Sequence, residues 1–177
     1  AILDEAAAAR ARLTDYVDES FDISVNLTNA SLQWDGLVEA VENSVKTHGI
    51  FCSQLCLEIT EQDAISSTED VVHKIEELKA HGHRFLIDDF GMGHTSLLYL
   101  QTGFFAVVKL DGSLTRNVLE NETNAEIIGS ITKLGESIHF TTIAEWVESK
   151  EQLEKLIWLN GLYNTEIHNC PLHLRQI

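Results

Sequence analysis

At residues 85–97 the chain reads FLIDDFGMGHTSL. An apolar run ends in the adjacent carboxylates of Asp88 and Asp89, and a loop with glycines at Gly91 and Gly93 follows. Two ionised carboxylates side by side repel each other, so the pKa of one rises unless a cation or a hydrogen-bond donor compensates. A bound metal ion is the simplest explanation of the pair, and the alternative is an acidic strand exit without a function.

Polar or charged side chains also stand late in other predicted strands. Alternating or apolar runs predict strands over residues 21–27, 54–60, 104–110 and 140–144, beside the strand that begins at Phe85. Successive side chains of a strand point to opposite faces, so parity places each polar residue away from the main apolar face of its strand. The residues concerned are Asn26, Glu58, Asp88 and Lys109, with Asp111 and Glu145 directly after their strands. This common placement predicts one shared site.

Helical patterns lie between the predicted strands. Apolar residues spaced by three and four predict helices over residues 1–17, 31–47, 68–81, 95–101 and 124–138. Ser67 is the expected cap of the helix over 68–81, and Ser149 with Gln152 forms a capping box before a last helix. A weaker strand is expected over residues 163–167.

Strand and helix therefore alternate, which predicts an α/β fold with parallel strands. Contributions to one site from several strands favour a TIM-type (β/α) barrel over an open, doubly wound sheet. At 177 residues the chain is one domain, yet it is short for a barrel, which typically needs roughly 200 residues or more. Because it starts without Met inside a helical pattern, we expect an incomplete barrel whose first strand is missing from this chain.

Composition argues against several kinds of partner and site. The net charge of −16 argues against binding long nucleic acid, and no apolar run approaches the ~20 residues of a membrane span. The three cysteines are an odd number that suits a reducing compartment, so we expect a cytoplasmic domain. A soft-metal site at Cys52 and Cys56 is disfavoured, because Cys56 falls in a strand and no second pair follows. The eight histidines lack paired ligand spacing, so His81, His83 and His94 are expected to be surface or structural residues.

The oxygen ligands of the predicted site suit Mg²⁺ or Mn²⁺ rather than zinc. A two-metal carboxylate site suits phosphate-ester hydrolysis, in which one ion generates hydroxide and both stabilise charge on the phosphate. Lys109 could hold the attacking water or neutralise developing charge, and a salt bridge inside the ring of acids explains it nearly as well. A Schiff-base lysine is a third interpretation, but surrounding acids favour the charged amine, which is a weak nucleophile.

Five motifs of this chain resemble, in order, those of the EAL domain family, bacterial phosphodiesterases that cleave cyclic di-GMP. They read SVNLT at 24–28, LEITE at 57–61, DDFG at 88–91 with Gly93 and Ser96, KLD at 109–111, and AEWVE at 144–148. The corresponding family motifs are VNLS, LEITE, DDFGxGxxS, KID and AEGVE. The resemblance covers essentially all of residues 1–177, and it implies a modified TIM-type barrel.

The resemblance also implies an activity, which is hydrolysis of cyclic di-GMP to the linear dinucleotide in bacterial second-messenger signalling. Two Mg²⁺ or Mn²⁺ ions would be needed. The implied metal ligands are Asn26, Glu58, Asp88 and Glu145, with Asp89 on the second ion. The implied catalytic residues are Lys109, which would position the water, Glu61, which would brace the loop after Asp89, and Glu148. The implied substrate-binding residues are Asp111 and Asn164.

The family resemblance extends to partners and cellular context. The loop after Asp89 closes over the metals in the family and often supports dimerisation, so we expect a homodimer through this loop. Upstream sensor or cyclase domains are expected in such proteins, and the full-length protein could be tethered to a membrane.

Departures from the family pattern leave other functions open. The EAL motif of the first strand is absent, which either truncation or true loss explains. Trp146 replaces the glycine of AEGVE and could crowd the pocket or point into the helix layer, and Asn164 stands for the family's nucleotide-binding Gln. The main alternative is a degenerate domain that binds cyclic di-GMP as a receptor. A protein-interaction scaffold is a further alternative, which the retained acids disfavour. We expect the active phosphodiesterase.

Overall fold

The structure, a computed structural model, describes residues 2–65, 68–91, 100–160 and 172–174. The chain divides into two compact units, Ala1–Leu86 (unit 1) and Ile87–Ile177 (unit 2). The boundary falls inside strand β3 (Phe85–Phe90), so each unit contains part of that strand. Each unit is described by itself.

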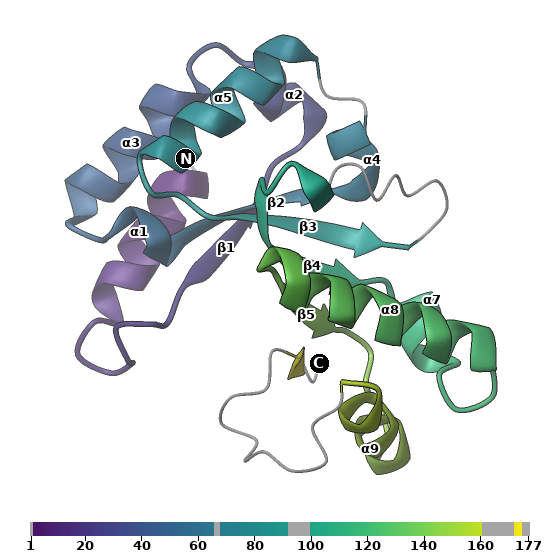
Figure 1. The fold of residues 1–177 in the computed structure, drawn as a ribbon. Coiled ribbons are helices and arrows are strands. Elements are labelled where there is room, and N and C mark those ends of the chain that lie inside the picture. The colour runs from purple at the N-terminus through teal and green to yellow at the C-terminus, as the bar shows by residue number, and fades with distance from the viewer. Residues whose placement is uncertain (1, 66–67, 92–99, 161–171, 175–177) are drawn as a thin grey trace. The chain divides into compact units, whose positions relative to one another are not determined.

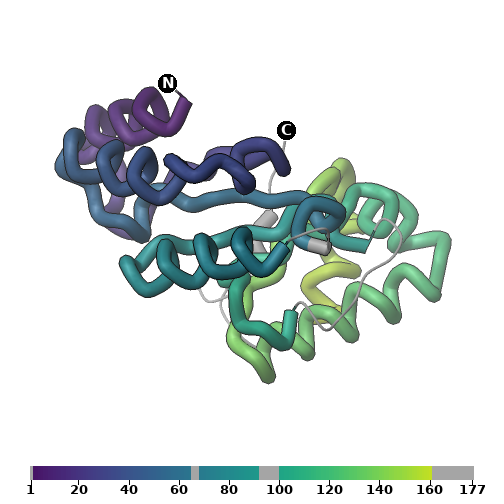
Figure 2. Tube along the Cα trace, turned by 90° about the horizontal axis from the view of Figure 1, so that it is seen from above, coloured from purple at the N-terminus to yellow at the C-terminus, as the bar shows by residue number. Residues whose placement is uncertain are grey.

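Unit 1 packs helices against parallel strands. In chain order its elements are α1 (Ile2–Arg12), β1 (Ile23–Asn26), α2 (Asn29–Gln33), α3 (Leu37–His48), the 3₁₀ turn η1 (Cys52–Gln54), β2 (Leu55–Thr60), α4 (Glu61–Ile65) and α5 (Glu69–Ala80). Strands β1 and β2 are parallel, with Asn26 opposite Glu58. Helix α3 contacts both α1 and α5, and the three lie in a row in both views (Figures 1 and 2).

The core of unit 1 follows from the apolar periodicity. Val25 of β1, Val45 of α3 and Leu55 of β2 form one buried cluster, and Cys52 packs against it. Helix α3 ends at Gly49, whose left-handed φ of 64° is a conformation that glycine adopts without strain. The buried Arg10 closes the turn after α1, because its Nε donates a hydrogen bond of 2.7 Å to the carbonyl of Phe21.

Unit 2 repeats the alternation of strand and helix. After β3 come β4 (Phe105–Leu110), α7 (Gly112–Arg116), α8 (Glu122–Ile138), β5 (Thr141–Ala144), α9 (Lys150–Leu159) and β6 (Leu172–Leu174). Strands β4 and β5 are parallel, with Lys109 opposite Ile143, and β5 pairs in parallel with β6. Helix α8 contacts β5, α7 and α9 (Figure 1), and it buries Ala125, Ile128 and Ile131.

The predicted α/β alternation is confirmed, and its local errors have physical causes. The helix predicted over 31–47 is broken between α2 and α3, because Trp34 is extended and Gly36 is a poor helix former. The cap of α5 is Thr68 rather than Ser67, which lies outside the described residues. The predicted strand over 163–167 also lies outside them, as does most of the helix over 95–101. Among the described residues, no helix is long and apolar enough to span a bilayer.

The capping box predicted at Ser149 is present and shapes the segment after β5. The Ser149 hydroxyl accepts a hydrogen bond from the Gln152 backbone N–H at 3.1 Å. Gln152 Oε1 accepts from the backbone N–H groups of Ser149 and Glu148 at 3.0 and 2.8 Å, and its Nε2 donates to the Arg116 carbonyl at 3.1 Å. These bonds hold the segment that follows Glu145 against the end of α7.

Candidate active site

A buried ammonium group is the centre of the acidic cluster in unit 2. Lys109, near the end of β4, has an exposed fraction of 5%. Its Nζ lies 2.9 Å from Asp88 Oδ1 and 3.0 Å from Glu145 Oε1. Asp88 lies late in β3, and Glu145 directly follows β5, so one lysine joins the carboxyl ends of these strands. The structure therefore brings together three of the residues that the sequence places late in, or directly after, their strands.

The salt-bridge interpretation of Lys109 thus matches the geometry, but it does not exclude a catalytic role. Charges removed from water are costly unless they are paired with good geometry, and this lysine faces two acids at contact distance. Two negative partners around one positive charge leave the group with an excess of negative charge. An added cation is therefore favoured here.

Asp89 shows this excess directly. Partial burial raises the pKa of its carboxyl, and the negative charges of Asp88, Asp111 and Glu145 raise it further, while Lys109 opposes the rise. Asp89 is exposed and has a left-handed φ of 55°, which is uncommon outside glycine but tolerated by Asp. Its backbone N–H donates to Asp88 Oδ1 at 2.9 Å. Hard oxygen donors that destabilise one another in this way fit a divalent ion such as Mg²⁺ or Mn²⁺.

Asp111 lies at the start of α7. Its Oδ1 accepts a hydrogen bond of 2.7 Å from the Ser113 backbone N–H and caps the helix, and its own N–H donates to the Phe90 carbonyl at 3.0 Å. This bond fixes the β4 exit against the end of β3. The predicted substrate-binding role of Asp111 stays a prediction.

Trp146 packs against helix α7. A Cβ at Gly112 would come within 2.3 Å of Trp146 Cδ1, so only glycine fits there. The guanidinium carbon of Arg116 lies 3.9 Å from the centroid of the indole ring, a cation–π distance. Trp146 has a left-handed φ of 58°, a conformation that glycine, the family's residue at this position, adopts without strain. Of the two interpretations left open by the sequence, contact with the helix layer is the one observed.

Arg116 gave no signal in the sequence, because no motif or spacing singles out a lone arginine in a short helix. Glu148 is exposed, and its backbone N–H is held by Gln152. Asn164 lies outside the described residues. The catalytic role of Glu148 and the substrate-binding role of Asn164 stay predictions.

Unit 1 contains the remaining predicted residues. Asn26 and Glu58 are register partners at the carboxyl ends of β1 and β2, and the Leu27 N–H donates to the Glu58 carbonyl at 2.8 Å. Glu58 is buried whereas Asn26 is exposed, and the buried Glu61 begins α4 directly after β2. The structure thus places an amide and a carboxylate side by side in this unit. That they join the acids of unit 2 in a single site stays a prediction.

The family model for the EAL domain matches residues 1–161. The chain belongs to the EAL domain family. A curated relative of this family, the bifunctional diguanylate cyclase/cyclic di-GMP phosphodiesterase MucR of Pseudomonas aeruginosa, is 33% identical over 155 residues. The match covers 88% of this chain but 23% of MucR, so the chain spans less than a quarter of that relative.

Solved structures of EAL proteins share the fold. The phosphodiesterase PaMucR in complex with c-di-GMP matches with a TM-score of 0.81 and 32% identity, over 89% of this chain and 64% of that chain. Klebsiella pneumoniae BlrP1 in a manganese/cy-diGMP complex matches with a TM-score of 0.79 and 26% identity, over 89% of this chain and 40% of that chain. These matches confirm the predicted TIM-type α/β fold class.

Replacing Lys109 with methionine tests the buried ion-pair cluster. Lys109→Met removes the shared cation and leaves two largely buried acids facing each other, so the free energy of unfolding should fall by about 3 kcal/mol without added metal. Urea denaturation measures the change. Lys150→Met is the matched control, because the Lys150 side chain is 82% exposed and pairs with Glu154 on the surface of α9. Its loss should change stability by less than about 0.5 kcal/mol. Similar small effects of the two substitutions would contradict a buried cluster.

Asp89→Asn tests the electrostatic strain at the site through pH. The raised pKa means that folded Asp89 holds its proton more tightly than the unfolded chain does. The protonated carboxyl therefore stabilises the fold fully below its ordinary pKa of 3.8, and this contribution is lost as pH rises through the folded pKa. In chelator at neutral pH, Asp89→Asn should therefore be more stable than the unmodified protein, and this advantage should vanish on acidification. Thermal unfolding between pH 4 and 7 measures it. The preference of Asn for a left-handed φ does not vary with pH, so a constant advantage would count against the electrostatic explanation.

Proposed function

We propose that this chain is a phosphodiesterase domain that hydrolyses one phosphodiester bond of cyclic di-GMP, giving the linear dinucleotide with the help of divalent ions. The observation that carries the proposal is the buried Lys109 held between Asp88 and Glu145, with Asp89 beside them, in a chain of the EAL domain family. The names of MucR and PaMucR, and the manganese/cy-diGMP complex of BlrP1, support the substrate and the need for metal.

The proposed ions are Mg²⁺ or Mn²⁺, because the donor set is made of carboxylate and amide oxygens. The proposed ligands are Asn26, Glu58, Asp88 and Glu145 for one ion, with Asp89 serving a second. Bound ions would supply an activated water at neutral pH and would stabilise negative charge on the phosphate. The excess negative charge around Lys109 supports this assignment, since a divalent ion would relieve it.

Lys109 is proposed to act as a fixed positive charge. Its ammonium is held by two carboxylates from neighbouring strands, so its position is set before substrate arrives. A preorganised charge stabilises developing negative charge without having to reorganise during the reaction. In the proposed reaction, Lys109 orients the attacking water and balances the charge that develops on the phosphate. A nucleophilic role is disfavoured, because the two acids favour the charged amine.

The other predicted residues complete the proposal. Asp111 and Asn164 are proposed to contact the nucleotide, and Glu61 is proposed to brace the loop that follows Asp89. Glu148 is proposed to belong to the catalytic set. Because the Gln152 bonds hold the segment after Glu145 in place, they support a fixed position for the Glu145 carboxylate.

The proposed context includes partners beyond the nucleotide. A homodimer through the loop after Asp89 is proposed, together with a cytoplasmic position of the domain. Upstream sensor or cyclase domains are also proposed, since the named relative MucR is bifunctional and the chain corresponds to 23% of it.

Turnover of cyclic di-GMP tests the proposal. The purified protein is incubated with cyclic di-GMP and Mn²⁺, and the linear dinucleotide is quantified by chromatography. We expect product that disappears on chelation. The rate should fall at least about a hundredfold in Glu58→Gln, since a lost metal ligand removes several kcal/mol of transition-state stabilisation. Glu154→Gln is the control, because the Glu154 side chain is 63% exposed on α9, away from the proposed machinery, and its activity should be unchanged.

Two results would contradict the proposal. Calorimetric binding of cyclic di-GMP without any product would support the receptor alternative instead. Product formed at equal rates by the unmodified protein and Glu58→Gln would show that the activity does not depend on this acid.

A further inference from the structure

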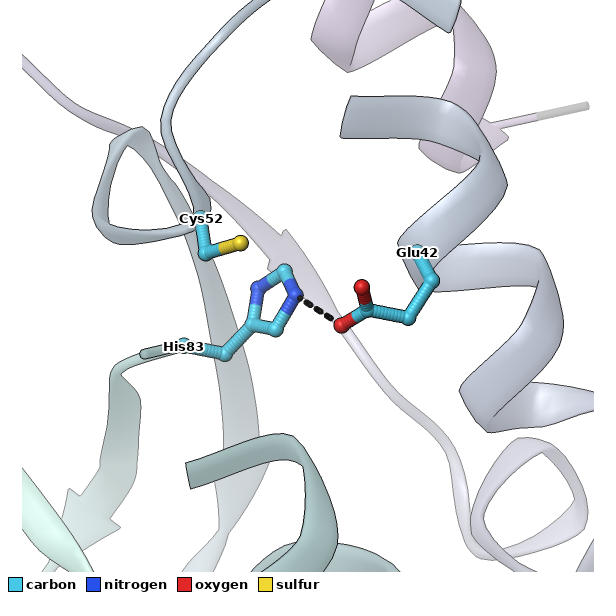
Figure 3. Close-up of side chains that lie close together, drawn as sticks. All are labelled: Glu42, Cys52 and His83. Atoms are coloured by element: carbon cyan, nitrogen blue, oxygen red, sulfur yellow. Dashed lines mark hydrogen bonds and ion pairs between the residues drawn. The ribbon is translucent and has the colours of Figure 1, made fainter. Parts of the chain in front are cut away.

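A second group of potential metal ligands lies in unit 1. Glu42 of α3, Cys52 of η1 and His83, which follows α5, each offer one ligand atom, and these atoms all lie within 4.8 Å of one another. Figure 3 shows the Cys52 thiol and the Glu42 carboxylate pointing toward the His83 ring. Cys52 and His83 come shortly before β2 and β3 begin, whereas Asn26 and Glu58 stand at the carboxyl ends of their strands. The group is therefore separate from the acids of the proposed active site.

The backbone holds the ligands of this group in place. The His83 N–H donates to the Leu78 carbonyl at 3.0 Å, which turns the chain back after α5. Gly82 makes this turn possible with a left-handed φ of +98°, and a Cβ there would lie 3.8 Å from the Cys52 Cβ. The turn therefore lies directly against Cys52. Cys52 in turn packs against the core cluster of Val25, Val45 and Leu55.

The hydrogen bonding of His83 is incomplete. Its side chain is fully buried, and its Nε2 lies 3.0 Å from Glu42 Oε1. Its other ring nitrogen, Nδ1, is buried and has no hydrogen-bond partner in the part of the chain that the structure describes. Among the described residues, the ring therefore interacts through Nε2, the nitrogen that faces Glu42.

We propose that Glu42, Cys52 and His83 bind one transition-metal ion of the zinc class. Thiolate sulfur, imidazole nitrogen and carboxylate oxygen are the three ligand types of zinc sites, and they suit Mg²⁺ poorly. Cys52 supplies Sγ, His83 supplies Nε2, the ring nitrogen that faces Glu42, and Glu42 supplies a carboxylate oxygen, while water completes a four-coordinate shell. His81 Nδ1 lies 3.0 Å from the same Glu42 oxygen, so this carboxylate has the outer hydrogen-bond support that metal ligands commonly have.

The proposed ion joins three segments of unit 1 that are far apart in sequence. It connects α3, the η1 turn before β2, and the turn that leads into β3. A ligand that binds only the folded state stabilises it, so the ion should strengthen the amino-terminal end of these strands. The sequence disfavoured a soft-metal site at Cys52 and Cys56, because Cys56 falls in a strand and no second cysteine pair follows. Cys56 is not part of this group, and burial in β2 raises the pKa of its thiol to about 12.

Cobalt binding tests this site separately from the proposed active site. Co²⁺ replaces Zn²⁺ in such sites and gives a charge-transfer absorption only when a thiolate is a ligand, so binding to carboxylates alone does not produce the band. The purified protein is titrated with Co²⁺ under reducing conditions. We expect a thiolate band that saturates at one equivalent and disappears when one equivalent of Zn²⁺ is added. Zn²⁺ should also raise the thermal unfolding midpoint by several degrees.

Two cysteine variants identify the ligand. Cys52→Ser keeps the size of the side chain but should abolish the band and the thermal shift. Cys56→Ala removes the other described cysteine and should leave both unchanged. His83→Gln should weaken the band. If His83→Gln does not fold, the comparison of Cys52→Ser with the unmodified protein still tests the site. Absence of a thiolate band in the unmodified protein, or a band of equal intensity in Cys52→Ser, would overturn the proposal.

Discussion

The pairing of the buried Lys109 ammonium with Asp88 and Glu145 is the interaction on which the candidate site depends. Lys109 is opposite Ile143 in the parallel β4–β5 register, which brings the segment after β5 near the lysine. The bond from the Asp111 N–H to the Phe90 carbonyl holds the β4 exit against the end of β3. Backbone register therefore sets the positions of all three charges. Because the acids outnumber the lysine, the same arrangement that positions them also creates the attraction for a further cation.

The two ends of the strands in unit 1 differ in chemistry. The carboxyl ends present the amide of Asn26 and the carboxylate of Glu58, which are hard oxygen donors. Near the start of β2 and β3 lie the thiol of Cys52 and the imidazole of His83, which are softer donors. A single small unit thus offers donor atoms suited to two classes of ion. Loss of one proposed ion should leave the other bound, since the two proposed ligand sets share no residue.

Much of the fold follows from periodicity in the sequence, because alternation and helical spacing report which side is buried. Their placement late in or directly after predicted strands indicated that Asp88, Lys109 and Glu145 lie together, as their contacts show. The capping box at Ser149 was found from residue types alone. The break between α2 and α3 was missed. The apolar spacing continues through Trp34 and Gly36, whereas the helical backbone is interrupted at these residues. The contact of Arg116 with Trp146 and the grouping of Glu42 with His83 depend on tertiary packing, which sequence spacing does not encode.

Anomalous diffraction from crystals grown with Mn²⁺ and cyclic di-GMP tests the central claim most directly. We expect manganese in contact with the carboxylates of Asp88 and Glu145 and with the side chains of Asn26 and Glu58. A second manganese is predicted on Asp89, with the phosphate of the nucleotide close to Lys109. Nucleotide bound without manganese at these acids, or manganese confined to other surface carboxylates, would contradict the claim that this acidic group is a two-metal hydrolytic site.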